Sequence, residues 1–405
     1  MILRAAWVVP VRCPPIRDGF VEVQADRIVA VGAAADRPGD DAEVTDLGSV
    51  ALVPGLVNAH THLELTAYHG RIQPSSFWDW LAELIKLRAA PGQVEREQFG
   101  VREGAWQSLR AGVTCVGDIS RLNLHWRMLK PIPIRKVCFV ELLSLAKDPP
   151  RTIDELRAGV AEVEEDALLT VGISPHTPYT VTRGDLRGAM RLASELERPW
   201  CAHWAETREE RAFLMGDSSG LPPWMLEPMQ QHGIDSPGVE AVDYLEACSA
   251  ECRPGALAHV NYIERGEARR LAEAGHVVVY CRRAHAFFGH DPHPFRELMH
   301  AGVAVAIGTD SAACNENLAL LEELRFLRDQ LHAPPTADTL LRMVTVNAAK
   351  ALGMLDRIGT LEPGKQADLV AFPCDPAVED PIAALVDRAP PAVGVWVAGD
   401  RVWWK

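Results

Sequence analysis

Short apolar runs alternate with amphipathic helical stretches through the middle of the chain, and this rhythm constrains the fold more than any other feature. Eight runs have the character of buried strands: Leu56–Ala59, Val113–Gly117, Val137–Glu141, Leu169–Ser174, Trp200–His203, Ala256–His259, His276–Cys281 and Val303–Gly308. Amphipathic stretches such as Glu95–Arg110 and Leu318–Leu331 separate them. Eight strands alternating with helices predict an α/β fold of the (β/α)8 TIM-barrel type. A doubly wound open sheet is the alternative, but no Gly-x-Gly-x-x-Gly follows any of these runs.

The two ends of the chain share a different, β-rich pattern. Short strand-like runs separated by turn residues occupy both ends: Ala6–Val9, Phe20–Val23, Ile28–Val31, Ser49–Val53, Asp368–Phe372, Val393–Val397 and Arg401–Trp403. Because the two chain ends share a β-rich pattern that the central segment lacks, we expect the ends to form one small domain into which a second domain is inserted. We therefore expect a composite β-sandwich domain from residues 1–54 and 356–405, and a barrel over residues 55–355.

Composition narrows the class of partner and the compartment. Lys and Arg number 41 against 55 for Asp and Glu, so the net charge of −14 disfavours nucleic acid and anionic membrane surfaces. No stretch approaches the ~20 apolar residues that a membrane helix needs. Nine scattered cysteines suit reduced thiols, which predicts a cytoplasmic protein rather than a disulfide framework.

Polar side chains fall where several of the predicted strands end, and TIM-barrel chemistry occurs at that end. His60 and His62 close the first strand, and residues two apart in a strand point to the same side. Five further polar residues lie at or just beyond other strand ends: His176, His203, Glu206, His259 and Asp310. Imidazoles with a carboxylate form a nitrogen and oxygen set suited to Zn²⁺ or Fe²⁺, with room left for water.

Each of these residues also has an ordinary structural interpretation. A single histidine on a strand is more often a hydrogen-bonded core residue than a ligand. Asp310 fits the N-cap of a helix that starts at Ser311, and Glu206 fits a solvated acid of a first helical turn, as do Glu209 and Glu210. Their coincidence at predicted strand ends favours a shared site.

Four segments resemble motifs of one known family. They are Val53–His62 (VPGLVNAHTH), His203–Glu206 (HWAE), Gly308–Ser311 (GTDS) with Asn315, and Gly359–Lys365 (GTLEPGK) with Ala367–Leu369 (ADL). They are similar to motifs of the aminohydrolase and chlorohydrolase branch of the amidohydrolase superfamily, which includes S-adenosylhomocysteine and methylthioadenosine deaminases. The resemblance covers nearly the whole chain.

The resemblance implies a site and an activity. His60, His62, His203 and Asp310 would hold one divalent metal, Zn²⁺ with Fe²⁺ as the alternative. Glu206 would shuttle protons, His259 would hold the attacking water, and His176 would contact substrate, so that Glu206, His259 and Asp310 are the expected catalytic residues. The implied activity is hydrolytic deamination of an amino-substituted nitrogen heterocycle, purine- or adenosine-like, with release of ammonia. The implied partners are a small-molecule substrate and further copies of the chain in a homo-oligomer.

Two alternatives to a deaminase stay open at this point. One is hydrolysis of a cyclic amide or a C–Cl bond, and the other is a catalytically silent binding protein of the same family. The segment after the seventh strand departs from the Cys-Pro-x-Ser-Asn of many relatives and reads Cys281–His290 (CRRAHAFFGH). Substrate identity therefore cannot be taken from those relatives.

Three residues are expected to bind substrate in addition to His176. Trp78 suits a flat heterocycle. Its ordinary structural interpretation is that it belongs, with Trp80, to the buried apolar face of a helix. Arg282 suits an anionic group, and His285 lies on the same Arg282–His293 loop. A second metal on this loop (His285, His290 and His293) is disfavoured by its prolines. Glu141 ends the third predicted strand and leaves a second metal open.

Overall fold

The computed structural model describes residues 1–36, 44–121, 125–145 and 150–405. Its centre consists of two four-stranded parallel sheets. The first contains β6 (Leu56–Thr61), β7 (Val113–Ser120), β8 (Arg135–Leu142) and β9 (Leu169–Pro175), and the second β10 (Cys201–Trp204), β11 (Ala256–His259), β12 (Val277–Tyr280) and β13 (Ala304–Ile307). Every one of the eight expected runs falls on one of these strands. Isolated parallel bridges, Ile173 to Trp200 and Thr61 to Asp310, link the two sheets. The parallel α/β prediction of TIM-barrel type is therefore confirmed.

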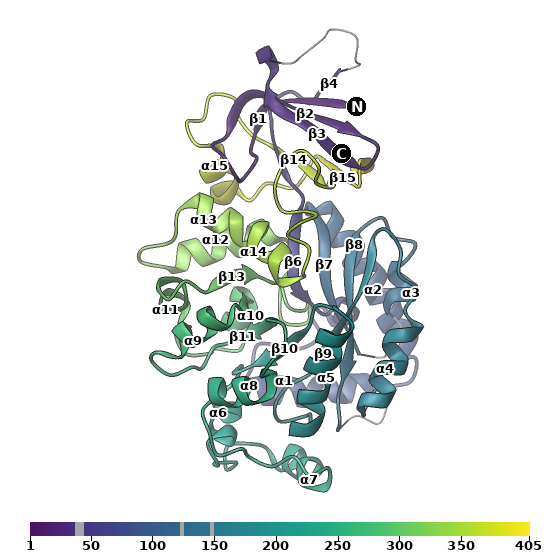
Figure 1. Ribbon diagram of the computed structural model, residues 1–405, viewed down its shortest axis with the longest axis vertical. Coiled ribbons are helices and arrows are strands. Elements are labelled where there is room, and N and C mark those ends of the chain that lie inside the picture. The colour runs from purple at the N-terminus through teal and green to yellow at the C-terminus, as the bar shows by residue number, and fades with distance from the viewer. Residues whose placement is uncertain (37–43, 122–124, 146–149) are drawn as a thin grey trace.

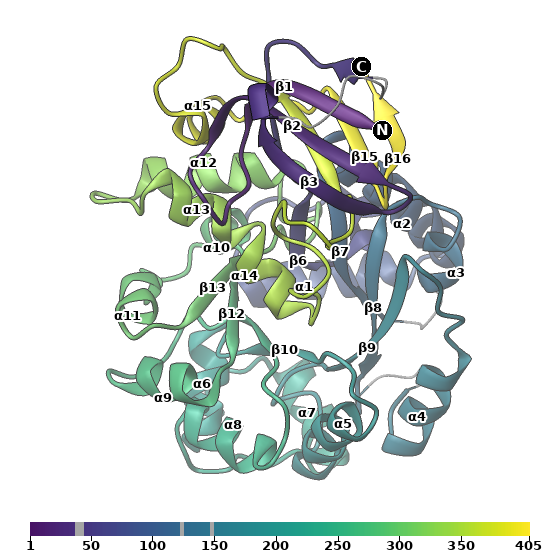
Figure 2. The same ribbon diagram turned by 45° about the horizontal axis from the view of Figure 1, so that its top comes forward.

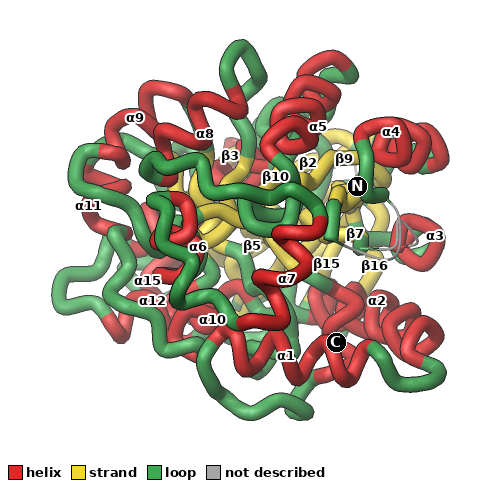
Figure 3. The backbone as a smooth tube through the Cα atoms, turned by 90° about the horizontal axis from the view of Figure 1, so that it is seen from below, coloured by secondary structure: helices red, strands yellow, loops and turns green. Residues whose placement is uncertain are grey.

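Helices surround the parallel strands when the molecule is viewed from the end away from the termini (Figure 3). They are η2 (Leu63–Tyr68), α1 (Phe77–Arg88), α2 (Gln93–Arg110), α3 (His125–Leu129), α4 (Ile153–Glu162), α5 (Arg183–Glu195), α6 (Arg208–Leu214), α7 (Pro223–Gln231), α8 (Ala241–Ser249), α9 (Glu267–Ala274), α10 (Arg282–Phe287), α11 (Phe295–His300), α12 (Leu320–Gln330), α13 (Ala337–Met343) and α14 (Val346–Ala351). No helix among the described residues is both long enough and apolar enough to cross a membrane.

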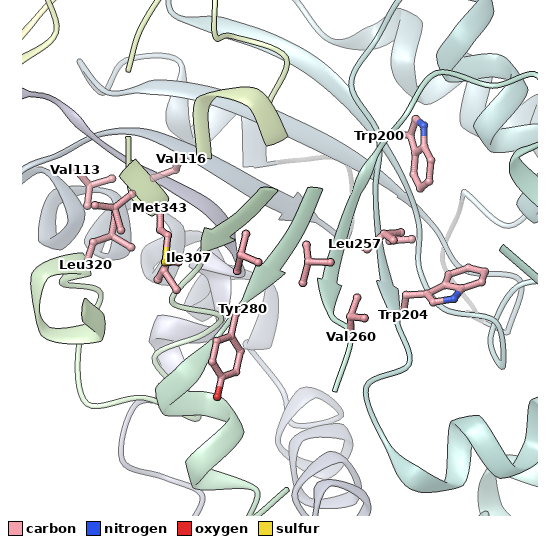
Figure 4. Close-up of a cluster of buried hydrophobic side chains, with 14 of the residues drawn as sticks. Val113, Val116, Trp200, Trp204, Leu257, Val260, Tyr280, Ile307, Leu320 and Met343 are labelled. Carbon is pink, nitrogen blue, oxygen red and sulfur yellow. The ribbon is translucent and has the colours of Figure 1, made fainter. Parts of the chain in front are cut away.

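Alternate strand residues pack into two separate buried clusters. On β11, Leu257 belongs to one cluster while Ala256 and Ala258 belong to the other. Figure 4 shows part of the first, in which Ile307 lies beside Met343 of α13 and Leu320 of α12, while Leu257 lies on the side of Trp204. The second cluster collects small strand residues with alanines of α14. Since successive strand side chains point to opposite faces, both faces of the parallel strands are buried, as helix-covered sheets require.

The strands of the two chain ends form one connected sheet at the top of the molecule, where the two termini lie close together (Figures 1 and 2). Its order is β16-β15-β14-β5-β1-β2-β3, with β4 paired to β1. The bounds are β1 (Ile2–Val8), β2 (Ile16–Gln24), β3 (Arg27–Ala33), β4 (Val44–Asp46), β5 (Val50–Pro54), β14 (Leu369–Pro373), β15 (Gly394–Val397) and β16 (Asp400–Trp404), accompanied by η1 (Ala34–Asp36) and α15 (Pro381–Arg388). The polar, exposed β4 was not expected from the sequence, because it has no apolar pattern.

A buried ion pair joins this terminal sheet to the parallel strands. Arg135 begins β8 and Asp368 precedes β14, and their side chains are 0% and 2% exposed. The guanidinium donates from Nε and Nη2 to the two carboxylate oxygens at 2.8 and 3.0 Å. The same carboxylate accepts the backbone N–H of Ala398 at 2.8 Å. This fork therefore anchors a strand of the C-terminal segment to the parallel layer.

Replacing Arg135 by methionine should lower the free energy of unfolding by about 3–5 kcal/mol, because Asp368 would keep a buried charge without its partner. The measurement is unfolding in urea. Arg4→Met, on β1 of the terminal sheet, is the matched control, since Arg4 pairs with Asp18 at the surface, where an ion pair contributes little to stability. Equal losses in the two variants would contradict the expectation.

Candidate active site

Three imidazoles meet at the carboxyl ends of β6 and β10. His60 lies within β6, His62 follows that strand directly, and His203 lies within β10. His62 Nε2 and His203 Nε2 are 3.1 Å apart, and the His60 ring centroid lies 5.0 Å from that of His62 and 4.8 Å from that of His203. One nitrogen from each ring lies within 4.8 Å of the other two. The structure thus brings together residues that are 141 positions apart in the chain.

The other ring nitrogen of each histidine faces the protein. His60 Nδ1 lies 3.8 Å from Cys201 Sγ, and His203 Nδ1 lies 3.3 Å from the carbonyl oxygen of His176. His62 Nδ1 lies 4.0 Å from Glu64 Oε1. His60 Nε2 is buried and has no hydrogen-bond partner among the described residues. The three Nε2 atoms are therefore the ones left for a shared ligand.

The charge state of these rings suits metal binding. Burial lowers the pKa of His60 and of His62 well below the usual range, and the neighbouring imidazoles lower both further. Burial also lowers the pKa of His203 to about 4. Neutral imidazoles present the lone pair that a metal ligand needs. An unpartnered buried nitrogen within a neutral three-imidazole group fits a Zn²⁺-type ion.

Asp310 supplies an oxygen beside the imidazoles. Its Oδ1 lies 3.9 Å from His62 Nε2, and its backbone N–H donates to the carbonyl oxygen of His60 at 3.2 Å. A side-chain carbon at Gly308 would lie 2.7 Å from that same carbonyl oxygen, so only glycine lets the chain after β13 approach β6 this closely. The next helix, α12, begins at Leu320, so the N-cap interpretation of Asp310 is wrong. Burial raises the pKa of Asp310 to about 7.

Glu206 and His259 form a second pair across the same strand ends. His259 Nε2 lies 3.4 Å from Glu206 Oε1, and the two side chains are each 6% exposed. The ring of His259 stacks on that of His203 at a centroid distance of 5.4 Å. Burial raises the pKa of Glu206 well above its usual range, and the carboxylates of Asp310 and Glu210 raise it further. A carboxyl group that holds its proton near neutral pH suits a proton donor.

Glu210 was expected to be a solvated acid, and this expectation is wrong. It is fully buried, and its carboxylate accepts the backbone N–H groups of Ala205 and Glu206 at 2.7 and 2.9 Å. Asn261 Nδ2 donates to the carbonyl oxygen of Glu206 at 2.9 Å. The backbone that carries Glu206 is thus held from both sides. Only the spacing of four residues between Glu206 and Glu210 hinted at this role.

Left-handed backbone occurs where three of the strands end. Ala205, His259 and Asp310 have φ values of 51°, 74° and 55°. Residues other than glycine in this region cost about 1–3 kcal/mol each and cluster at functional sites. The strained backbone at the ends of β10, β11 and β13 thus coincides with residues that the site brings together, although other turns of the chain adopt the same conformation.

His176 follows β9 and lies beside this group. Its ring centroid is 4.9 Å from that of His203, and its Nδ1 is 2.7 Å from Thr180 Oγ1. Its Nε2 is 3.9 Å from Glu141 Oε1. Burial raises the pKa of Glu141 to about 7. Glu141 belongs to neither of the two ligand-type clusters found among the described residues, so they offer no second-metal group around it.

The other expected substrate-binding residues have mainly protein contacts. Trp78 in α1 packs against Tyr179, which follows β9, at a ring distance of 5.4 Å. Arg282 lies over the ring of Phe326 at 5.1 Å, and its Nη1 is 3.3 Å from His285 Nδ1. The other nitrogen of His285 is 2.8 Å from the carbonyl oxygen of Asp291. These three residues therefore lie around the strand ends without a described contact to His60, His62 or His203.

A buried charged cluster next to the imidazoles was not anticipated from the sequence. Glu64, Asp118 and His125 form the second ligand-type group. Its acids are already matched by cations: Arg88 donates to Glu64 at 2.7 Å, and His125 Nδ1 is 2.7 Å from Asp118 Oδ2. Although burial opposes it, Asp118 raises the pKa of His125 to about 9, so the imidazole is charged at neutral pH. The cluster therefore has the character of an internal ion-pair network.

Parallel strands whose carboxyl ends gather neutral imidazoles, an aspartate and a buried glutamate of raised pKa define a metal-dependent hydrolase of the TIM-barrel type. The sequence model described as the amidohydrolase family matches residues 51–402. The chain therefore belongs to the amidohydrolase family.

Similar proteins include several deaminases. A 5-methylthioadenosine/S-adenosylhomocysteine deaminase of Moorella thermoacetica is 29% identical over 386 residues, covering 91% of this chain and 85% of that protein. The crystal structure of an adenosine deaminase from Xanthomonas campestris with bound zinc has a TM-score of 0.83 at 26% identity, covering 99% and 92% of the two chains. An aminofutalosine deaminase from Helicobacter pylori, in complex with methylthio-coformycin, has a TM-score of 0.88 at 22% identity, covering 99% and 100%, and shows the likeness of fold.

Proposed function

We propose that this protein is a metal-dependent hydrolytic deaminase of an adenosine-like substrate and releases ammonia from an amino-substituted ring carbon. The observation that carries the proposal is the pairing of a three-imidazole group with Glu206, a buried carboxyl group of raised pKa that lies 3.4 Å from His259 Nε2. Similarity to methylthioadenosine/S-adenosylhomocysteine and adenosine deaminases over nine-tenths or more of the chain supports the substrate class.

His60, His62, His203 and Asp310 are the proposed ligands of one divalent metal, Zn²⁺ or Fe²⁺. The donor set supports this assignment, because the Nε2 atoms of His62 and His203 are 3.1 Å apart and Asp310 Oδ1 lies 3.9 Å from the first of them. The zinc bound in the Xanthomonas campestris relative favours Zn²⁺. Once bound, such an ion would lower the pKa of a water molecule to about 7 and so make a nucleophile available at neutral pH.

The protein's own groups then move the protons. The Asp310 carboxylate takes the proton released by the attacking water. His259 Nε2, held beside Glu206, orients that water toward the ring carbon. Attack places electrons on the adjacent ring nitrogen, where Glu206 donates its proton. Glu206 then takes the proton of the new ring hydroxyl and passes it to the amino group, so that the C–N bond breaks, ammonia leaves and the ring carbonyl forms. The proton held by Asp310 returns Glu206 to its starting state. A positioned acid–base group of this kind contributes about 10²–10⁴ in rate.

Trp78, His176, Arg282 and His285 are the proposed substrate-binding residues. His176 is supported by its position between His203 and Glu141. Trp78 is supported by its packing on Tyr179, on the same loop as His176. Arg282 and His285 are supported by their place on α10, directly after β12.

The finer architecture is part of the proposal. The bridges at Thr61 and Ile173 support closure of the two parallel sheets into one eight-stranded barrel over residues 55–355. The pairing of β14 with β5 supports one composite domain, a β-sandwich, from residues 1–54 and 356–405.

Nine free cysteines fit a cytoplasmic location.

A panel of amino-heterocycles tests the function. We expect the zinc-loaded protein to release ammonia from adenosine, methylthioadenosine or S-adenosylhomocysteine, with absorbance moving from the adenine to the hypoxanthine spectrum. Cytosine, a cyclic amide and a chlorotriazine serve as comparison compounds, assayed at the same enzyme concentration. Turnover of the amide or chloride in the absence of any ammonia release would contradict the deaminase proposal.

A further inference from the structure

A charged network is buried immediately behind His62. Arg88, at the end of α1, donates from Nη2 to Glu64 Oε1 at 2.7 Å and from Nε to Glu97 Oε1 at 2.9 Å. Tyr68 donates to the same Glu97 oxygen at 2.9 Å. The side chains of Glu64, Glu97 and Arg88 are 1%, 6% and 17% exposed. The network therefore ties η2, which follows His62 directly, to α1 and α2.

A second arm fixes the start of η2. Asp118 on β7 accepts the backbone N–H of Leu63 at 2.9 Å, and its other oxygen is 2.7 Å from His125 Nδ1. His125 Nε2 lies 4.0 Å from Glu64 Oε2. That second oxygen of Glu64 is buried without a hydrogen-bond partner among the described residues. Glu64 is thus held from two sides, and its carboxylate is not fully satisfied by either.

Burying several ionised groups costs several kcal/mol per ion before their mutual attraction is counted, and apolar residues of similar size often serve stability as well or better. Stability alone is therefore a weak reason for charges at this position. Besides Arg88 and His125, the group beside Glu64 that gains from a negative charge is His62, whose Nδ1 lies 4.0 Å from Glu64 Oε1. At that distance the carboxylate acts through charge rather than through a hydrogen bond.

We propose that Glu64 is a positioning residue for His62: its buried carboxylate, held by Arg88, favours the imidazole tautomer with the proton on Nδ1 and leaves the Nε2 lone pair for the metal. The physical basis is general, since metal-bound histidines usually direct their other ring nitrogen to a carboxylate or a carbonyl, which fixes the tautomer and the ring orientation. Here His203 faces the His176 carbonyl oxygen, and Glu64 is the corresponding group for His62. The inference rests on the proposed assignment of His62 as a ligand.

The chain offers a matched pair of variants. Glu64 and Glu97 bind the same guanidinium, but Glu97 has no described contact with His62. Zinc affinity of the apoprotein is measured by competition with a chromophoric chelator. Glu64→Gln should weaken zinc binding by about 10- to 100-fold, the usual effect of removing such a partner. Glu97→Gln should lower the thermal midpoint and leave zinc affinity near that of the parent.

Three outcomes decide the matter. Parent-like zinc affinity in Glu64→Gln, or an equal loss in Glu97→Gln, would overturn the role of Glu64. If Glu64→Gln does not fold, Glu64→Asp and Glu97→Asp replace the pair, because aspartate keeps the charge but withdraws it by one methylene, and only the first should weaken zinc. His62→Asn separates the two proposals: zinc retained in this variant refutes the ligand assignment itself, whereas zinc lost there and kept in Glu64→Gln refutes only the positioning role.

Discussion

Replacing Glu206 by glutamine should lower kcat for deamination by about 10²- to 10⁴-fold while bound zinc stays near the parent level. Glutamine has nearly the same shape and keeps an oxygen toward His259 Nε2, which lies 3.4 Å from the carboxylate in the parent. It cannot release a proton to the ring nitrogen. The measurement combines steady-state kinetics by ammonia release with metal analysis of the same preparation.

Glu209→Gln is the matched control, since this acid is three residues along and only partly buried. It should leave kcat within about twofold of the parent, as expected for a surface substitution away from the reacting atoms. Near-normal turnover in Glu206→Gln with full metal content would refute the proton-shuttle role. Loss of zinc from that variant would instead place Glu206 among the metal ligands.

Loss of the metal should abolish turnover. Removing zinc with a chelator, or replacing His60 by asparagine, is expected to lower activity by more than about 10³-fold, because free water is too weak a nucleophile at neutral pH. His60 Nε2 is a buried nitrogen without a hydrogen-bond partner among the described residues, so replacing His60 removes a metal donor from the three-imidazole group. The readouts are metal content and initial rate, before and after Zn²⁺ or Fe²⁺ is added back.

The exposed His69, which follows η2, supplies the control variant His69→Asn. It should bind metal and turn over substrate like the parent. Chelated wild-type protein should recover on addition of metal, whereas His60→Asn should not. Full activity in the metal-free protein would refute the metal-dependent mechanism.

The order of strands was readable from the sequence because each parallel strand is buried on both faces and so forms a short, nearly continuous apolar run. The same logic located the polar residues: a histidine or aspartate that interrupts such a run at its end, as His203 and Asp310 do, has few reasons to be there apart from function. Sequence reasoning could therefore bring His60, His62, His203, Glu206, His259 and Asp310 to one end of the fold, where the structure places them.

Other features of the site depend on contacts with residues distant in the sequence, which no local sequence pattern predicts. Glu210 has the sequence context of a helix-start acid, and only the fold around Ala205 turns it into a buried acceptor. From the sequence, Arg88 is a basic residue at the C-terminal end of a helix, a position where the helix macrodipole favours positive charge at the surface. Its burial between Glu64 and Glu97 comes from the packing of η2 against α2, which periodicity does not encode. The strand β4 escaped prediction because its three residues are exposed and show no apolar pattern.

The composite terminal sheet has a consequence for how the polypeptide is made. β5 hydrogen-bonds to β14, which follows all eight parallel strands in the chain, so its partner leaves the ribosome only after those strands have been made. At ~5–20 residues per second, that delay is on the order of tens of seconds. Until then the nascent chain carries an unpaired apolar edge that is open to other chains. A stop codon shortly before Leu369 would therefore yield an aggregating product rather than an enzyme that merely lacks its tail.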